Sequence, residues 1–205
     1  RTKISRITLP SYYALSLAAF SLALLSKETS LSFPIAILLY DLCFMRDARW
    51  HPFKSRLLFI YLPLCLLIVA FILFSPTLRS AVMDWLGKID GNYALAQSRI
   101  WIYAVKLCLF PINLTFDYDF PSHWIPQDLL SFSPVIFWLV LVLAVIKNFR
   151  RISPVVSFSI LWFFITLFPT NSFLPRADLL SERNLYLPSL GPTLLFPVSF
   201  IVRSS

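Results

Sequence analysis

The stretch FPTNSFLPRADLLSERNLYLPSLGP, residues 168–192, decides how this chain is organised. It is polar and rich in proline, and it separates two runs, residues 152–167 and 193–202, that contain no ionisable side chain. Its charged residues lie within eight positions and are Arg176, Asp178, Glu182 and Arg183. Such a segment between apolar runs is typical of a loop at a membrane boundary. Its charges either form a polar site or only mark helix ends, and composition alone favours neither interpretation.

The composition favours an integral membrane protein built from helices. Hydrophobic residues make up 58% of the 205 residues, charged residues only 14%, and there are 20 phenylalanines. Soluble domains average about 25% charged residues. Several stretches reach the roughly 17–20 apolar residues that a helix needs to cross a bilayer. We therefore expect an all-α polytopic bundle.

The net charge of +8 does not indicate a nucleic-acid partner, because the basic residues cluster in short segments that flank apolar runs. Cytoplasmic loops of membrane proteins have this pattern. The three cysteines include no CxxC pair, and the two histidines lie in different loops. The sequence therefore predicts no disulfide framework and no metal site within the chain.

A topology with six membrane spans places every cluster of basic residues on the cytoplasmic side. The spans are residues 9–26, 29–45, 57–76, 132–146, 152–167 and 190–202. Residues 1–6, 46–56, 147–151 and 203 then lie inside. Residues 27–28, 77–133 and 170–189 lie together outside. Asp41 falls within the second span, so its carboxylate should face protein or the headgroup layer.

A seventh apolar segment, residues 99–114, is expected to be an interfacial or re-entrant helix on the outer face. If it crossed, the basic residues 147–151 would lie outside, against the charge asymmetry. Lys106 and Pro111 also weaken it as a span. The alternative is that this segment is a true span, which gives an odd number of membrane spans. A further short helix over residues 179–187 would place Glu182 and Tyr186 on one face.

The predicted outer segments hold most of the acidic residues together with several arginines. A guanidinium binds phosphate through two hydrogen bonds, and a carboxylate can act as general base toward an acceptor hydroxyl. This combination suits a site for a phosphate-linked lipid. The alternative is that Glu182 and Arg183 only have structural partners. With three glycines and no P-loop or GxSxG motif, nucleotide chemistry and serine-hydrolase chemistry are disfavoured. The acidic residues of the predicted outer segments are Glu28, Asp84, Asp90, Asp117, Asp119, Asp178 and Glu182, and the arginines there are Arg99, Arg176 and Arg183.

Three stretches resemble one protein family. They are LLSKETSLSFPIAILLYDL (residues 24–42), SRIWIYAVKLCLFPINLTFDYDFP (98–121) and FPTNSFLPRADLLSERNLYLPSLG (168–191). The third resembles an outer loop that ends in glutamate–arginine–x–leucine–tyrosine–leucine–proline–serine–x–glycine. The family is that of the transmembrane and tetratricopeptide-repeat proteins, which in animals are O-mannosyltransferases of the GT-C class and which have many bacterial relatives.

The resemblance implies a GT-C-like multi-pass membrane glycosyltransferase that takes a sugar from a polyprenyl-phosphate carrier. It would transfer the sugar to a protein hydroxyl on the non-cytoplasmic face, in a bacterial inner membrane rather than the endoplasmic reticulum. The donor is then a substrate, and the chain itself carries no cofactor, while the use of a divalent metal is left open. Membrane lipid and neighbouring subunits are expected partners. Residues 1–205 would form one membrane domain of a longer protein. The acidic first outer loop would precede Arg1, and the tetratricopeptide repeats would follow Ser205.

The predicted side of the membrane, the charge of each residue and this resemblance together give each candidate residue an expected role. The expected catalytic residues are Glu182, Asp117 and Asp119. The expected substrate-binding residues are Lys27, Glu28, Arg99, Tyr118, Arg183 and Tyr186, with Arg99 or Lys27 on the carrier phosphate. An alternative is a non-catalytic accessory subunit that packs within a larger membrane complex. A transporter ranks third, because the spans lack the buried ionisable residues of an ion path.

Overall fold

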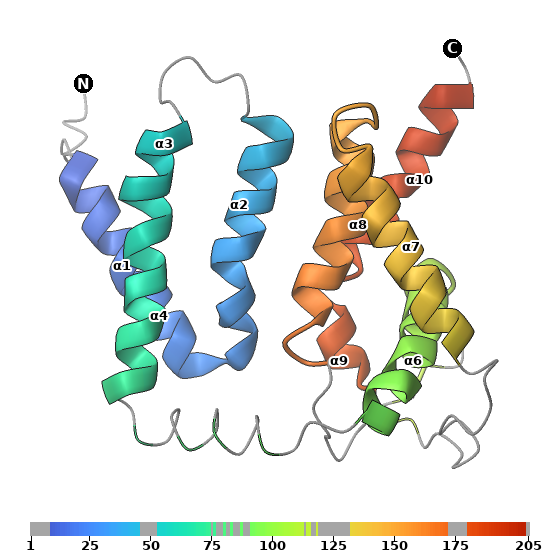
Figure 1. The fold of residues 1–205 in the computed structure, drawn as a ribbon, viewed down its shortest axis with the longest axis horizontal. Coiled ribbons are helices and arrows are strands. Elements are labelled where there is room, and N and C mark those ends of the chain that lie inside the picture. Colours follow the sequence, from blue (N-terminus) through green and yellow to red (C-terminus); the bar gives the residue numbers. More distant parts are fainter. Residues whose placement is uncertain are drawn as a thin grey trace, which may run out of the picture.

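The computed structural model of the chain describes residues 9–45, 53–74, 76, 80, 83, 87, 91–112, 114, 115, 118, 132–171 and 180–203. Within these residues every regular element is a helix, as expected (Figure 1). The longer elements are α1 (Leu9–Ser26), α2 (Phe33–Phe44), α4 (Leu62–Phe74), α6 (Gly91–Leu109), α7 (Ser133–Lys147), α8 (Pro154–Leu167) and α10 (Leu190–Arg203). The shorter ones are η1 (Glu28–Ser32), α3 (Phe53–Arg56), η2 (Leu57–Tyr61) and α9 (Glu182–Leu185).

The long helices run between two ends of the molecule, which we call the upper and lower ends after their place in Figure 1. The upper end contains the turn between α7 and α8 and the adjoining ends of α2 and α3. The lower end contains the turn between α1 and η1, the start of α6, and α9. The charge pattern predicts this grouping of segments, with the upper end cytoplasmic. That assignment of sides stays a prediction.

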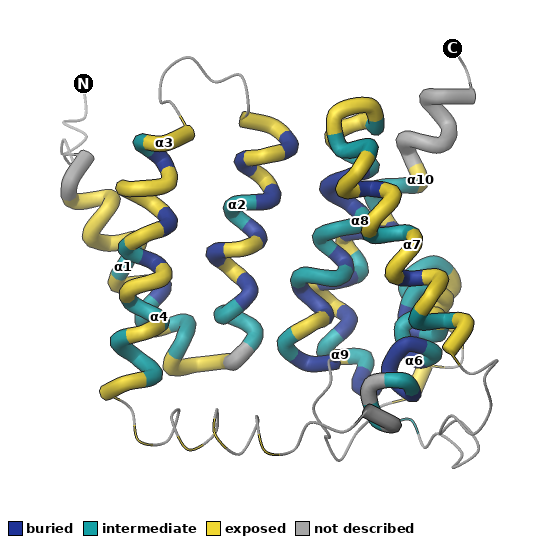
Figure 2. Tube along the Cα trace, viewed as in Figure 1, coloured by how far each residue is buried: buried dark blue, intermediate teal, exposed yellow. Residues whose placement is uncertain are grey.

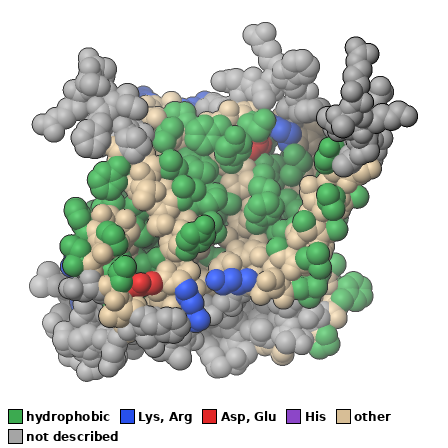
Figure 3. Space-filling model, turned by 180° about the vertical axis from the view of Figure 1, so that it is seen from behind, with side chains coloured by type: hydrophobic (Ala, Val, Ile, Leu, Met, Phe, Trp, Pro, Cys, Tyr) green, Lys and Arg blue, Asp and Glu red, His purple; other side chains and the backbone are tan. Residues whose placement is uncertain are grey.

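Apolar side chains face outward over much of the surface. Exposed positions follow the length of α1 and α4 in Figure 2, and Phe74 is 85% exposed. From behind, hydrophobic side chains cover the middle of the molecule, while charged ones lie near its two ends (Figure 3). Water disfavours so much exposed apolar surface, whereas lipid accepts it. The surface therefore suggests association with a membrane.

One helix of the described chain, Phe53–Phe74, is long and apolar enough to cross a bilayer by length and composition. Its 22 residues rise about 33 Å, at about 1.5 Å per residue. Four shorter apolar helices accompany it: Ser11–Ser26, Thr29–Phe44, Ser133–Lys147 and Pro154–Leu167. Each coincides with a predicted span, but six crossings of a membrane remain a prediction.

The main core lies between α6, α8 and the segment that leads into α9. Its fully or nearly fully buried members are Ile100, Ala104, Leu107, Phe163, Leu167, Leu180 and Leu185. A second cluster of Leu39, Cys43 and Phe158 joins α2 to α8. On its other side α8 packs against α10, where Gly191 brings the two backbones close together. Helix α8 therefore connects the two halves of the molecule.

Two predicted boundaries were wrong, and one predicted environment is confirmed. Helix α6 begins at Gly91, eight residues before the predicted start, and ends at Leu109, two residues before Pro111. Helix α9 covers only Glu182–Leu185 instead of residues 179–187. Asp41 is buried, as expected, in an ion pair with Arg56, and it accepts a hydrogen bond of 3.1 Å from the Tyr61 hydroxyl.

Candidate functional site

The candidate site is built around Glu182, the first residue of α9 at the lower end. Its Oε1 atom accepts a hydrogen bond of 2.6 Å from the Tyr118 hydroxyl. The same oxygen accepts a second bond of 2.7 Å from the backbone N–H of Thr115. Hydrogen bonds to a carboxylate are stronger than those between neutral groups. The carboxylate therefore holds the segment after α6 against the start of α9.

Helix α6 supports Tyr118 from the other side. The rings of Tyr103 and Tyr118 meet edge to face with centroids 5.5 Å apart. Lys106 Nζ lies 5.6 Å from the centroid of Tyr103, within the range of a cation–π interaction. Arg99, four residues before Tyr103, shares this face of α6 because residues three and four apart are neighbours on a helix. Two cations therefore lie on the helix face that touches Tyr118.

Tyr118 is a stable hydrogen-bond donor. Burial raises the pKa of its hydroxyl above the ordinary value of 10.0, and the hydrogen bond to Glu182 raises this pKa further. The neutral phenol is the form that donates to a carboxylate. Tyr118 therefore keeps its proton, and its bond to Glu182, throughout the neutral pH range.

A buried polar layer connects α6 to the end of α8. Gln97 is 1% exposed and Asn171 is 2% exposed, and the Asn171 amide donates a long hydrogen bond of 3.4 Å to Gln97 Oε1. The Trp101 indole donates to the Asn171 carbonyl at 2.9 Å, and the Trp138 indole donates to the Ser98 carbonyl at 2.8 Å. Buried polar groups of this kind fix one arrangement of the helices. The layer therefore sets the position of α6, which supports the site.

The structure brings together some of the predicted site residues. Glu182 and Tyr118 are in contact, and Arg183 is exposed beside Glu182. Tyr186 is 84% exposed, and the residue that Glu182 contacts is Tyr118. Lys27 is exposed at the lower end between α1 and η1. The side chain of Glu28 and the residues Asp117 and Asp119 lie outside the described part of the chain.

The arrangement presents an anchored carboxylate beside cations. Both donors bind Oε1 of Glu182, so neither of them uses Oε2. A carboxylate held in this way can accept a proton from a hydroxyl group that approaches its second oxygen. Within the described part of the chain, no three His, Cys, Asp or Glu residues are grouped to hold a metal ion. The described chemistry is therefore that of a carboxylate, two tyrosines and nearby cations.

Sequence reasoning did not find the contributions of Thr115, Tyr103 and Lys106. Thr115 acts through its backbone N–H, which no side-chain motif reveals. Tyr103 and Lys106 lie four and seven residues after Arg99, and this helical spacing is the signal that places all three on one face. The spacing alone does not show that this face meets Tyr118.

A comparison with known proteins found one informative similarity. The chain is 31% identical over 126 residues to protein O-mannosyl-transferase F38B6.6 of Caenorhabditis elegans. The match covers 55% of this chain, and this chain spans only 18% of the length of that relative. No family model and no solved structure matches the chain. The similarity supports an O-mannosyltransferase-like relationship and, at most, a glycosyltransferase-like function.

Proposed function

We propose that this chain is the membrane-embedded part of a glycosyltransferase that moves a sugar from a polyprenyl-phosphate carrier to a protein hydroxyl on the non-cytoplasmic face. Two independent observations support the proposal. The chain is similar to a protein O-mannosyl-transferase. Glu182 and Tyr118, two of the residues expected to act in such an enzyme, are joined by a hydrogen bond. The contact between Glu182 and Tyr118 is the observation that carries the proposal.

In this proposal Glu182 has two roles, one for each carboxylate oxygen. Oε1 anchors the segment of Thr115 and Tyr118, and Oε2 receives the acceptor hydroxyl or orders it for attack. Asp117 and Asp119 flank Tyr118 in the sequence, and we propose that one of them completes the acidic part of the site. The anchored Tyr118 would then set where the acceptor lies.

The carrier phosphate would bind to cations around this carboxylate. Arg183 adjoins Glu182 in α9, and its exposed guanidinium can hold two phosphate oxygens at once. Arg99 lies on the face of α6 that carries Tyr103, and we propose that it contacts the same phosphate. Lys27 at the same end of the molecule is the second candidate for this role, with Glu28 and Tyr186 as lesser contributors.

The test of this assignment is Arg183→Lys in the full-length protein. The measurement is sugar transfer from a polyprenyl-phosphate donor per mole of folded protein. A lysine keeps the charge but loses the paired hydrogen bonds, so we expect transfer to fall about tenfold or more. Lys54→Arg, at an exposed position of α3 at the upper end, is the control and should transfer normally. Wild-type transfer by Arg183→Lys would remove Arg183 from the site.

The second candidate function is that of an accessory subunit without catalysis. One observation favours it: both hydrogen bonds described for Glu182 come from the chain itself, as they would in a structural brace. A brace needs only an acceptor oxygen, whereas a general base needs a carboxylate. Glu182→Gln keeps an acceptor and removes the charge, so this variant separates the two functions.

A further inference from the structure

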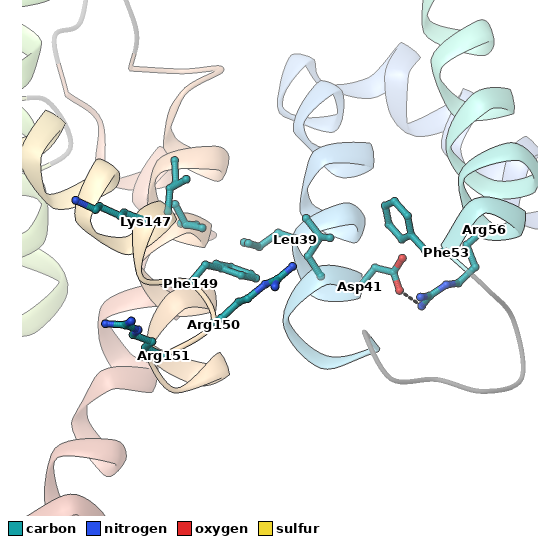
Figure 4. A pocket seen from close by; sticks show the side chains of 11 residues that line it. Leu39, Asp41, Phe53, Arg56, Lys147, Phe149, Arg150 and Arg151 are labelled. Carbon is teal, nitrogen blue, oxygen red and sulfur yellow. Dashed lines mark hydrogen bonds and ion pairs between the residues drawn. The ribbon is translucent and has the colours of Figure 1, made fainter.

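A cavity of about 780 Å³ lies at the upper end, far along the helices from Glu182 (Figure 4). It is bounded by α2, by α3 and by the turn between α7 and α8. Its apolar walls consist of Leu39, Leu42, Phe53, Ile146, Phe149 and Leu161. The charged residues that line it are Asp41, Arg56, Lys147, Arg150 and Arg151. The proposed sugar transfer uses none of these residues.

Arg56 is buried in the wall of this cavity and has donor capacity left over. Its side chain is only 9% exposed, and it forms an ion pair with Asp41. Its Nε atom has no hydrogen-bond partner among the described residues, although it is buried. A buried donor without a partner is costly, but Nε exposes almost no surface, so an occupant of the cavity does not reach it. The case for a bound anion therefore rests on the other cations of the cavity.

The remaining charges of the cavity favour an anionic occupant. Asp41 and Arg56 neutralise each other, which leaves Lys147, Arg150 and Arg151 as an excess of three positive charges. Figure 4 shows Arg150 extending from the α7–α8 turn toward Leu39 of α2, across the cavity. A soluble anion would contact only the cations of the cavity. The leucine, isoleucine and phenylalanine side chains beside these cations fit a ligand that also has an apolar part.

We propose that this cavity binds the headgroup of an anionic phospholipid, with its acyl chains along the apolar walls. A basic pocket between helices near one membrane surface is a recognised arrangement for such headgroups. The phosphate would accept hydrogen bonds from Arg150, and the chains would lie against Leu42 and Ile146. This inference rests on the membrane insertion of the chain and is independent of the proposed sugar transfer.

Native mass spectrometry of the detergent-solubilised protein tests the proposal. The probes are dioleoyl phosphatidylglycerol, which is anionic, and dioleoyl phosphatidylcholine, which is zwitterionic. We expect the wild-type chain to retain the anionic lipid in preference to the zwitterionic one. The double variant Arg150→Gln/Arg151→Gln should bind the anionic lipid at least about tenfold more weakly. Each cation near a membrane surface raises the affinity for an anionic lipid about fivefold.

The control is Lys54→Gln/Lys106→Gln, which removes two exposed positive charges outside the cavity. It should retain the wild-type lipid preference, as should Glu182→Gln, which alters only the proposed catalytic end. Equal retention of both lipids by the wild-type chain would overturn the proposal. An equal loss in the test and control variants would also overturn it, because net charge would then explain binding. If sn-glycerol 1-phosphate bound as tightly as the lipid, the apolar walls would have no part and the site would be one for a soluble anion.

The test substitutions lie at exposed positions of the α7–α8 turn, so the fold should tolerate them. Thermal unfolding in detergent would confirm this before lipid is added. Arg150→Gln alone serves as a second test variant, because Arg150 extends into the cavity in Figure 4. Wild-type preference for the anionic lipid in both variants would contradict the proposal.

Discussion

Tyr118 and Glu182 lie 64 residues apart in the sequence, and their side chains are joined by a hydrogen bond of 2.6 Å. The bond connects the segment after α6 to the start of α9, at the lower end of the molecule. Tyr118 also packs against Tyr103 of α6, so the contact is supported on both sides. The relationship therefore orients a carboxylate at this end of the molecule.

Tyr118→Phe removes the donor of this bond while it keeps the ring against Tyr103. We expect the variant to be less stable by about 1.5–3 kcal/mol, the usual range for a hydrogen bond to a charged group. The measurement is the free energy of unfolding in detergent by chemical denaturation. Tyr186→Phe changes a hydroxyl on an exposed side chain and serves as the control, with no expected loss. Equal stability of Tyr118→Phe and the wild type would show that the bond is unimportant.

Comparison of the wild type with Tyr118→Phe also gives a prediction about pH. The folded-state pKa of Tyr118 is raised above its ordinary value of 10.0, so folding favours the protonated phenol. The contribution of the bond is therefore fully present below about pH 10 and is lost as the pH rises through the folded-state pKa. The stability difference between wild type and Tyr118→Phe should be constant from neutral pH to about pH 9. A difference that already falls near pH 7 would contradict the assignment.

At Gly191 the backbone of α10 lies close against α8. A Cβ atom added there would lie 2.4 Å from the Ser159 carbonyl oxygen and 3.1 Å from Phe163 Cβ. Because the closer contact is with backbone, the helices must separate, and we expect Gly191→Ala to cost about 1–3 kcal/mol of stability. Gly87→Ala is the matched control, because nothing lies within 4 Å of its added Cβ. A neutral Gly191→Ala would mean that α8 and α10 pack less closely.

The buried pair of Asp41 and Arg56 predicts a strong coupling. Arg56→Gln leaves the Asp41 carboxylate buried without its cation, which costs about 3–5 kcal/mol for a fully buried pair. Asp41→Asn strands Arg56 in the same way, although the introduced amide oxygen could still accept a hydrogen bond from Tyr61. The double variant should be much more stable than the sum of the single losses predicts, because it leaves no unpaired charge. Additive losses in a denaturation series would contradict the pairing.

The sequence predicts the helices best where a charge or a proline stands at their ends. Lys27 follows the last residue of α1, and Pro154 begins α8, and both helices lie within a few residues of their predicted bounds. Helix α6 was misplaced at its start because GNYALAQS is too polar to resemble a span. Two polar residues of this stretch, Gln97 and Ser98, are buried by protein. Tertiary burial of this kind leaves no periodic signal in the sequence.

The two central side chains of the candidate site could be predicted from the sequence, but their contact could not. Glu182 and Tyr118 were both named, yet their pairing depends on how α6, α8 and α9 pack, over 64 residues of chain. A helix over residues 179–187 would have placed Tyr186 on the same face as Glu182. Helix α9 ends at Leu185, and Tyr186 is exposed. The contact with Tyr118 joins distant parts of the chain, which no local spacing reveals.

Labelling of single cysteines tests the predicted topology. In a chain whose three native cysteines are replaced, Lys54→Cys and Tyr186→Cys place thiols at exposed positions of the upper and lower ends. An impermeant maleimide added to sealed cells should label only Tyr186→Cys, because the basic residues predict a cytoplasmic upper end. Both thiols should react after the membrane is opened. Labelling of both, or of Lys54→Cys alone, in sealed cells would contradict the six-span topology.

The most direct test of the proposed site is sugar transfer by Glu182→Gln in the full-length protein. Glutamine keeps an oxygen that can accept the bonds from Tyr118 and Thr115, so the melting temperature should stay close to that of the wild type. It cannot accept a proton, so transfer from a polyprenyl-phosphate donor should fall about a hundredfold or more if Glu182 is a general base. A large loss of transfer with unchanged stability is the result that the proposal predicts. Wild-type transfer by Glu182→Gln would reduce Glu182 to a structural brace and contradict the proposed site.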